Sequence, residues 1–70
     1  MKEILVRYGY ALRKLRLEQN LSQEEFADKC DLHRTYISDV ELGKRNVSLE
    51  NIERISNALG MTISEFFKEV

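Results

Sequence analysis

The 70-residue sequence predicts an all-α fold, a compact five-helix bundle. Apolar residues recur at helical spacing, no stretch alternates at period two as a strand would, and no proline interrupts the pattern. A chain of this length allows one domain, residues 1–70, with a small core that an oligomer would help to stabilise. The helices follow one another with short connections, as in a bundle.

The first helix is expected over about residues 3–19. Its apolar stripe begins at Leu5 and continues through a set of residues three or four apart: Tyr8, Ala11, Leu12 and Leu15. Asn20 is a plausible stop, because asparagine tolerates the left-handed conformation. Ser22 starts the second helix, and Glu25 three residues later completes a capping box. The apolar face of this helix is Phe26, Ala27 and Cys30.

Asp31 and Leu32 make a turn into a third helix over about residues 33–42, which stops at Gly43. Residues 43–47 are expected to form an exposed loop. Ser48 then caps a fourth helix that ends at Gly60, with a buried stripe of Ile52, Ile55 and Leu59. A second capping box, Thr62 with Glu65, begins a short fifth helix over about 63–69.

Composition excludes several classes of protein. One cysteine and one histidine give no zinc site, and Cys30 reads as a buried, reduced thiol. No apolar run approaches the roughly 20 residues of a membrane span, and the N-terminus has too short an apolar stretch for a signal peptide. Nucleophile–base, metalloprotease and phosphate-loop motifs are absent. We therefore expect a cytoplasmic protein that is not an enzyme, with no metal, cofactor, small-molecule ligand or membrane partner.

The net charge of -1 argues at first against a nucleic-acid partner, but the distribution of charge matters more. Residues 1–20 carry five basic and two acidic side chains, and Lys44 and Arg45 lie together in the predicted loop. Residues 48–70 are net acidic. A basic region at one end fits a protein that binds phosphates locally.

The second and third helices, with their short turn, form a predicted helix-turn-helix over about residues 22–42. The third helix places Ile37, Val40 and Glu41 on its back and a short polar row on its front: Arg34, Thr35, Ser38 and Asp39. An apolar back and a polar front suit a helix that reads a DNA groove. The plainer interpretation is an ordinary helical pair within a bundle.

The polar front supplies the candidate base contacts. Arg34 can donate two hydrogen bonds to guanine O6 and N7, and Thr35 offers a hydroxyl and a methyl group. Ser38 and Asp39 lie on the next turn. Asp39 either accepts from cytosine N4 or, because a carboxylate repels phosphate, pairs locally with Arg34 or Lys44.

Other residues are candidate phosphate contacts. Gln23 lies at the start of the second helix, beside free backbone N–H groups. His33 contacts phosphate or a base edge, or else only caps the third helix. Tyr36 is expected to have a partly buried ring with its hydroxyl on phosphate. The remaining candidates lie in the loop and at the next cap: Lys44, Arg45, Asn46 and Ser48.

Several motifs resemble the Cro/repressor-type helix-turn-helix proteins, also called the xenobiotic-response-element family. The resemblance covers about residues 8–67 and rests on YG at 8–9, LR at 15–16, LSQEEFA at 21–27, YIS at 36–38 and ELGKR at 41–45. HRTYIS at 33–38 followed by RNVS at 45–48 is similar to the controller proteins of restriction-modification systems. Those controllers are small dimeric regulators that time expression of the endonuclease.

The resemblance implies a lambda-repressor-like DNA-binding domain whose 43–47 loop lies on the DNA backbone. It also implies a structural ion pair between Arg16 in the first helix and Glu41 near the end of the third. Leu42 departs from the pattern, because a basic residue would suit a controller protein better at that position.

Phe66 and Phe67 are adjacent, so on a helix they point about 100° apart and only one can easily enter the core. An apolar patch is left over, which predicts a two-fold dimer interface formed by Met61, Ile63, Phe66, Phe67 and Val70. A dimer would place two reading helices about one DNA turn apart, on a near-palindromic operator.

These features together predict a sequence-specific transcription regulator that binds a double-stranded DNA operator as a homodimer, as a restriction-modification controller would. The alternative is a protein-interaction or antitoxin-like module with the same fold and weak DNA binding, which the net negative charge, Asp39 and Leu42 would favour. The operator, and the choice between activator and repressor, are not written in the protein sequence.

Overall fold

The computed structural model describes residues 3–70, so the first two residues of the predicted 1–70 domain lie outside it. The described part contains five helices and no strand, which confirms the predicted fold class. The helices are α1 (Glu3–Glu18), α2 (Gln23–Cys30), α3 (Arg34–Glu41), α4 (Leu49–Ala58) and α5 (Ile63–Phe67). The fifth helix ends two residues before the predicted boundary, and a turn follows it.

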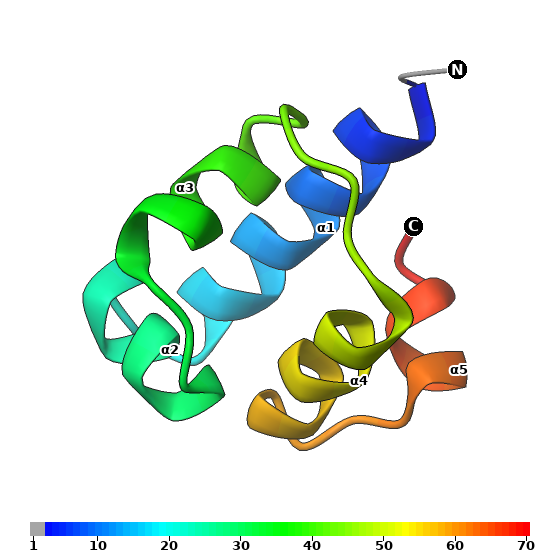
Figure 1. Cartoon of the computed structure of the whole chain (residues 1–70). Coiled ribbons are helices and arrows are strands. Elements are labelled where there is room, and N and C mark those ends of the chain that lie inside the picture. Colours follow the sequence, from blue (N-terminus) through cyan, green and yellow to red (C-terminus); the bar gives the residue numbers. More distant parts are fainter. Residues whose placement is uncertain (1–2) are drawn as a thin grey trace.

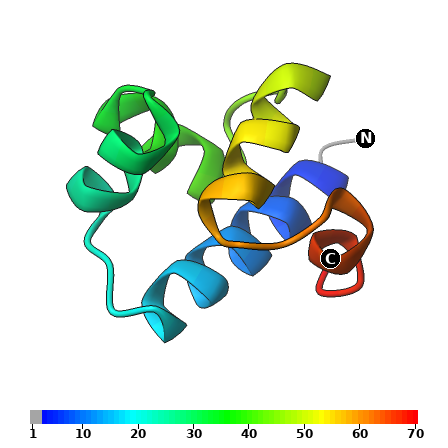
Figure 2. The ribbon, with the colours of Figure 1, turned by 90° about the horizontal axis from the view of Figure 1, so that it is seen from below.

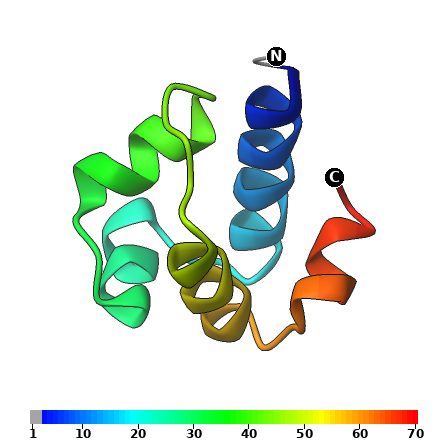
Figure 3. The ribbon, with the colours of Figure 1, turned by 45° about the vertical axis from the view of Figure 1, so that its right-hand side comes forward.

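The long α1 helix lies in the middle of the molecule (Figure 1). Figure 3 shows α2 and α3 on one side of α1 and α5 on the other, with α4 between α2 and α5. The view from below in Figure 2 keeps the same separation of α3 from α5. α3 packs on both α1 and α2 and leaves its outer face uncovered by other helices.

Local sequence signals set the helix ends. Both predicted capping boxes are present: the Ser22 and Thr62 hydroxyls each accept from the backbone N–H three residues on, and Glu25 and Glu65 accept in return. Asn20 has the left-handed φ of 59° that was predicted for the end of the first helix. Gly43 and Gly60 also have positive φ values, as their predicted stop positions require.

The core contains most of the predicted apolar stripes and joins all five helices. Leu5 and Ile52 are the exceptions, because both are only half-buried. The buried residues of the core are Tyr8, Ala11, Leu12, Leu15, Phe26, Ala27, Cys30, Ile37, Val40, Ile55, Leu59 and Phe66. Gly9 marks the close approach of α1 to α3, because a Cβ atom there would collide with the backbone carbonyl of Val40. Burial and this close approach together fix where α3 lies.

The structure separates the two neighbouring phenylalanines. Phe66 is completely buried, with its ring centroid 4.8 Å from that of Tyr8, whereas Phe67 keeps 39% of its surface exposed. The prediction that only one ring enters the core is confirmed. The assignment of Phe66 to a dimer interface is wrong, because a ring with no exposed surface cannot contact a partner.

Cys30 is buried, as predicted, and burial raises the pKa of its thiol to about 11. Burial also raises the pKa of the Tyr8 phenol. The Tyr8 hydroxyl has no hydrogen-bond partner within residues 3–70. Both groups become anions when they lose a proton, so the folded state keeps them protonated at neutral pH.

The raised pKa of Cys30 predicts a loss of stability in alkali. The folded thiol holds its proton more tightly than the unfolded one, so its stabilising contribution is complete below about pH 9 and disappears as the pH approaches 11. Thermal unfolding of wild type and Cys30→Ala should therefore show a difference in midpoint that is constant near neutrality and shrinks above pH 9. A difference that stays constant up to pH 11 would contradict the assignment.

Candidate nucleic-acid interface

The polar front of α3 faces away from the core. Arg34 and Thr35 are exposed at its first turn, and Ser38 and Asp39 are half-buried at its second. On the opposite side, Ile37 and Val40 are buried against α1 and α2, and the Glu41 carboxylate is only 3% exposed. The predicted back and front of the third helix are therefore both present.

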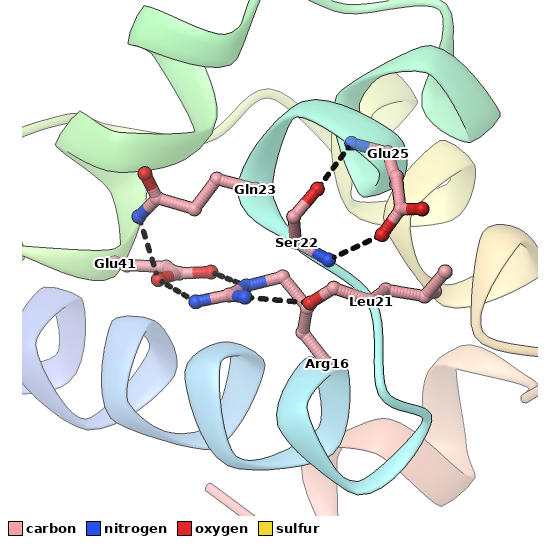
Figure 4. Close-up of polar contacts among 6 residues, drawn as sticks. All are labelled: Arg16, Leu21, Ser22, Gln23, Glu25 and Glu41. Carbon is pink, nitrogen blue, oxygen red and sulfur yellow. Dashed lines mark hydrogen bonds and ion pairs between the residues drawn. The ribbon is translucent and has the colours of Figure 1, made fainter.

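A buried ion pair ties the end of α3 to α1 (Figure 4). Arg16 Nε donates to one carboxylate oxygen of Glu41 at 2.6 Å, and Nη2 donates to the other at 3.0 Å. The third nitrogen, Nη1, donates to the carbonyl of Leu21 at 2.7 Å, just before α2. This bidentate arrangement confirms the predicted Arg16–Glu41 pair and also anchors the start of the helix-turn-helix.

Gln23 joins the same network, which the sequence did not predict. Its side-chain Nε2 donates to Glu41 at 3.0 Å (Figure 4). An amide nitrogen carries two hydrogens, so one N–H remains for an outside acceptor. The half-buried Gln23 lies at the N-terminus of α2, where the first backbone N–H groups of a helix favour an anion. Its phosphate contact stays a prediction.

His33 occupies the N-cap position of α3, but its imidazole makes no capping hydrogen bond. By contrast, the hydroxyls of Ser22, Ser48 and Thr62 each cap their helix. His33 therefore stands at the cap position, as one alternative predicted, but it caps without its side chain. Its contact with phosphate or a base edge stays a prediction. The imidazole is exposed, and the first backbone N–H groups of α3 receive no hydrogen bond from it.

Tyr36 is half-buried, as predicted, and two residues hold it in place. The Asn51 side chain donates from Nδ2 to the Tyr36 hydroxyl at 3.0 Å. The Arg45 guanidinium lies over the Tyr36 ring, 4.8 Å from its centroid, in a cation–π contact. Neither contact was predicted. Arg45 lies within the 43–47 loop and Asn51 lies beyond it, so no helical spacing relates either residue to Tyr36.

The loop after α3 gathers the other predicted phosphate contacts. Lys44, Arg45, Asn46 and Ser48 are all exposed. The backbone N–H of Lys44 donates to the carbonyl of Asp39 at 2.9 Å, which turns the chain back beside α3. Ser48 Oγ accepts from the backbone N–H of Asn51 at 3.1 Å and keeps its own hydrogen for another acceptor.

Asp39 and Leu42 are the two departures from the expected pattern. Within residues 3–70, the Asp39 carboxylate takes part in none of the three ion pairs, so the predicted local pairing with Arg34 or Lys44 is not observed. Leu42 is 60% exposed at the end of α3. Asp39 therefore adds an unpaired negative charge beside the candidate interface, and Leu42 adds an apolar surface there.

The predicted dimer residues lie on the side of the molecule away from α3 (Figures 1 and 3). Ile63 and Phe67 are exposed, and Met61 and Val70 are half-buried against the core. Beside Phe67 is a small, mainly apolar hollow lined by Ile4, Leu5, Tyr8, Asn46, Val47 and Ile52. Without Phe66, Ile63 and Phe67 remain exposed on α5, and Phe67 borders the same hollow as Ile4 at the start of α1.

Among residues 3–70, no group of three or more histidine, cysteine or acidic side chains is placed to hold a metal ion. Within the same part of the chain, no helix has both the length and the apolar character needed to cross a membrane.

Comparison with known proteins agrees with the helix-turn-helix fold described above. A helix-turn-helix family model matches residues 12–66. The chain is 55% identical over 71 aligned residues to control protein C.MunI from Mycoplasma sp, covering 100% of this chain and 96% of that protein. It is 62% identical over 55 residues to control protein C.BamHI from Bacillus amyloliquefaciens, covering 77% and 68% respectively.

The fold has close matches among solved structures as well. The restriction-modification controller protein C.AhdI from Aeromonas hydrophila superposes with a TM-score of 0.87 at 46% identity. The match covers 90% of this chain and 96% of that one.

Proposed function

This chain belongs to the helix-turn-helix family of DNA-binding transcription regulators, and we propose that it controls a restriction-modification system as a homodimer on a near-palindromic operator. Its relatives C.MunI and C.BamHI are control proteins, and the chain covers most of the length of both. The relatives come from bacteria, so the proposed place of action is the cytoplasm, beside the DNA. The proposal includes no catalytic step and no cofactor.

The exposed Arg34 and Thr35 at the first turn of a rigidly held α3 carry this proposal. The N-terminal residues of a recognition helix are those that reach base edges in the major groove. Arg34 would recognise guanine through two hydrogen bonds, and Thr35, Ser38 and Asp39 would read the neighbouring positions. Because a buried ion pair holds α3 in place, its backbone needs no ordering on binding, and only the exposed side chains lose conformational freedom.

The flanking residues would bind the DNA backbone. The predicted phosphate contacts lie at the start of α2, the start of α3 and the loop before α4: Gln23, His33, Tyr36, Lys44, Arg45, Asn46 and Ser48. They lie on both sides of the base-reading residues, as register-fixing contacts should. Two of them in each protomer, Lys44 and Arg45, are cationic, so the affinity should fall with rising salt.

Nuclear magnetic resonance tests this surface directly. On titration with a short duplex at low ionic strength, the backbone amides of residues 34–39 and 44–48 should shift most. Amides on the outer face of α1, around Tyr10 and Leu17, serve as the internal control and should stay nearly unchanged. Shifts concentrated on that α1 face, with α3 unaffected, would contradict the proposal.

We place the dimer interface on α5, with Phe67 at its centre. Phe67 and Ile63 together expose an apolar surface that is continuous with the hollow at the start of α1. A two-fold axis near α5 would bring the same patch of two protomers together, as an isologous interface requires. Met61 and Val70 would lie at its edge.

Phe67→Arg is expected to convert the dimer to a monomer. The new guanidinium would place a charge opposite its symmetry copy within an apolar contact, which costs several kcal/mol at about 25 °C. Sedimentation equilibrium should show half the wild-type mass, with an unchanged helical circular dichroism spectrum. Tyr10→Arg makes the same exchange at an aromatic residue that is 70% exposed on α1, and it should keep the dimer mass. A Phe67→Arg protein of dimer mass would refute this interface.

A further inference from the structure

We propose that Asn51 is a positioning residue that makes the Tyr36 hydroxyl a hydrogen-bond donor toward the DNA backbone. Asn51 belongs to α4, outside the helix-turn-helix, and is half-buried. The inference rests on the proposed DNA-binding function and adds to it the residue that sets the direction of one hydrogen bond.

The hydrogen-bond inventory of the two groups carries the inference. A tyrosine hydroxyl has one hydrogen to donate and lone pairs with which to accept. The Asn51 Nδ2–H occupies one lone pair of the Tyr36 oxygen at 3.0 Å. The hydroxyl hydrogen of Tyr36 is then free to point elsewhere, and a phosphate oxygen, which can only accept, requires such a donor.

The position of Asn51 is itself fixed. Its backbone N–H donates to Ser48 Oγ at 3.1 Å, which makes Asn51 the third residue of α4 after the cap. The Arg45 guanidinium covers the Tyr36 ring from the loop. Three segments, α3, the loop and the first turn of α4, therefore meet at Tyr36 and hold its hydroxyl in one orientation.

Asn51→Asp reverses the polarity of this contact while preserving its shape. A carboxylate can only accept, so it would take the hydrogen of the Tyr36 hydroxyl and leave lone pairs facing the phosphate. Binding of a selected operator duplex should weaken at least about tenfold, the size expected for loss of a hydrogen bond to a charged group. Fluorescence anisotropy titration measures this change.

Asn51→Asp should weaken binding without lowering the stability of the protein, which should rise or stay unchanged. An acidic residue in the first turn of a helix interacts favourably with the helix dipole. The thermal midpoint of Asn51→Asp should therefore equal or exceed that of the wild type. A residue that served only to hold the fold together would lose stability and binding together.

Asn51→Asp both reverses a hydrogen bond and adds a negative charge, and the Tyr36→Phe background separates these two effects. Without the hydroxyl there is no hydrogen to redirect, so adding Asn51→Asp to Tyr36→Phe should weaken binding by less than about threefold, the effect of charge alone. If Asn51→Asp weakens binding equally in both backgrounds, or has no effect in wild type, the inference is wrong while DNA binding stands. If wild type binds no duplex, the proposed function and the inference both fail.

Discussion

Arg34→Ala is expected to abolish sequence-specific DNA binding while the fold and the dimer remain intact. A bidentate arginine–guanine contact contributes about 1–3 kcal/mol of discrimination. Two protomers on one operator would lose it twice, or about 2–6 kcal/mol, which corresponds to at least about 30-fold in affinity. Arg34 is exposed, so its removal leaves no cavity and should hardly affect stability.

The measurement is a comparison of affinities for a selected duplex and a scrambled one. Binding of the scrambled duplex should change little, because phosphate contacts dominate non-specific affinity. Lys14→Ala removes the same charge from α1, at a side chain paired with Glu69 near the C-terminus, and should preserve discrimination. An Arg34→Ala protein that still prefers the selected duplex as the wild type does would favour a protein-interaction module, in which Arg34 is only a solvated charge.

The second large effect is on stability. Arg16→Ala would leave the Glu41 carboxylate buried with Gln23 as its remaining side-chain partner, and would also remove a donor from the Leu21 carbonyl. Breaking one side of a buried ion pair costs about 3–5 kcal/mol. A protein of this size has only about 5–10 kcal/mol of stability, so the variant should lose a large part of it and unfold at a much lower urea concentration.

Urea unfolding followed by circular dichroism, at one fixed protein concentration, measures this cost. The Lys14–Glu69 pair is the matched control, because its side chains are 52% and 36% exposed. Lys14→Ala should lose less than about 1 kcal/mol, as exposed pairs do. Arg16→Lys should fall between the two, since lysine keeps the charge but loses the two-pronged geometry. Equal losses for Arg16→Ala and Lys14→Ala would show that burial gives the pair no special role.

The helix ends were predicted well because short-range interactions determine them. The capping boxes at Ser22 and Thr62 and the left-handed Asn20 depend on backbone geometry within a few residues, so sequence spacing alone specifies them. The Arg16–Glu41 contact spans 25 residues, and it was predicted from the family resemblance rather than from spacing.

The missed features depend on tertiary geometry. The Asn51–Tyr36 contact crosses 15 residues and an irregular loop whose path no periodic pattern specifies. Phe66 and Phe67 are identical neighbours on a five-residue helix, too short for periodicity to indicate which ring faces the core. The answer came only from the packing of Phe66 against Tyr8. Charge patterning likewise could not show that Asp39 remains unpaired within residues 3–70.

Selection from a pool of randomised duplexes tests most directly whether this protein reads DNA sequence through α3. The pure wild-type protein should enrich a near-palindrome whose two half-sites lie about one helical turn apart. Each half-site should contain a guanine whose replacement weakens the wild type but not Arg34→Ala. If no sequence is enriched at low ionic strength, the protein does not read DNA sequence through α3.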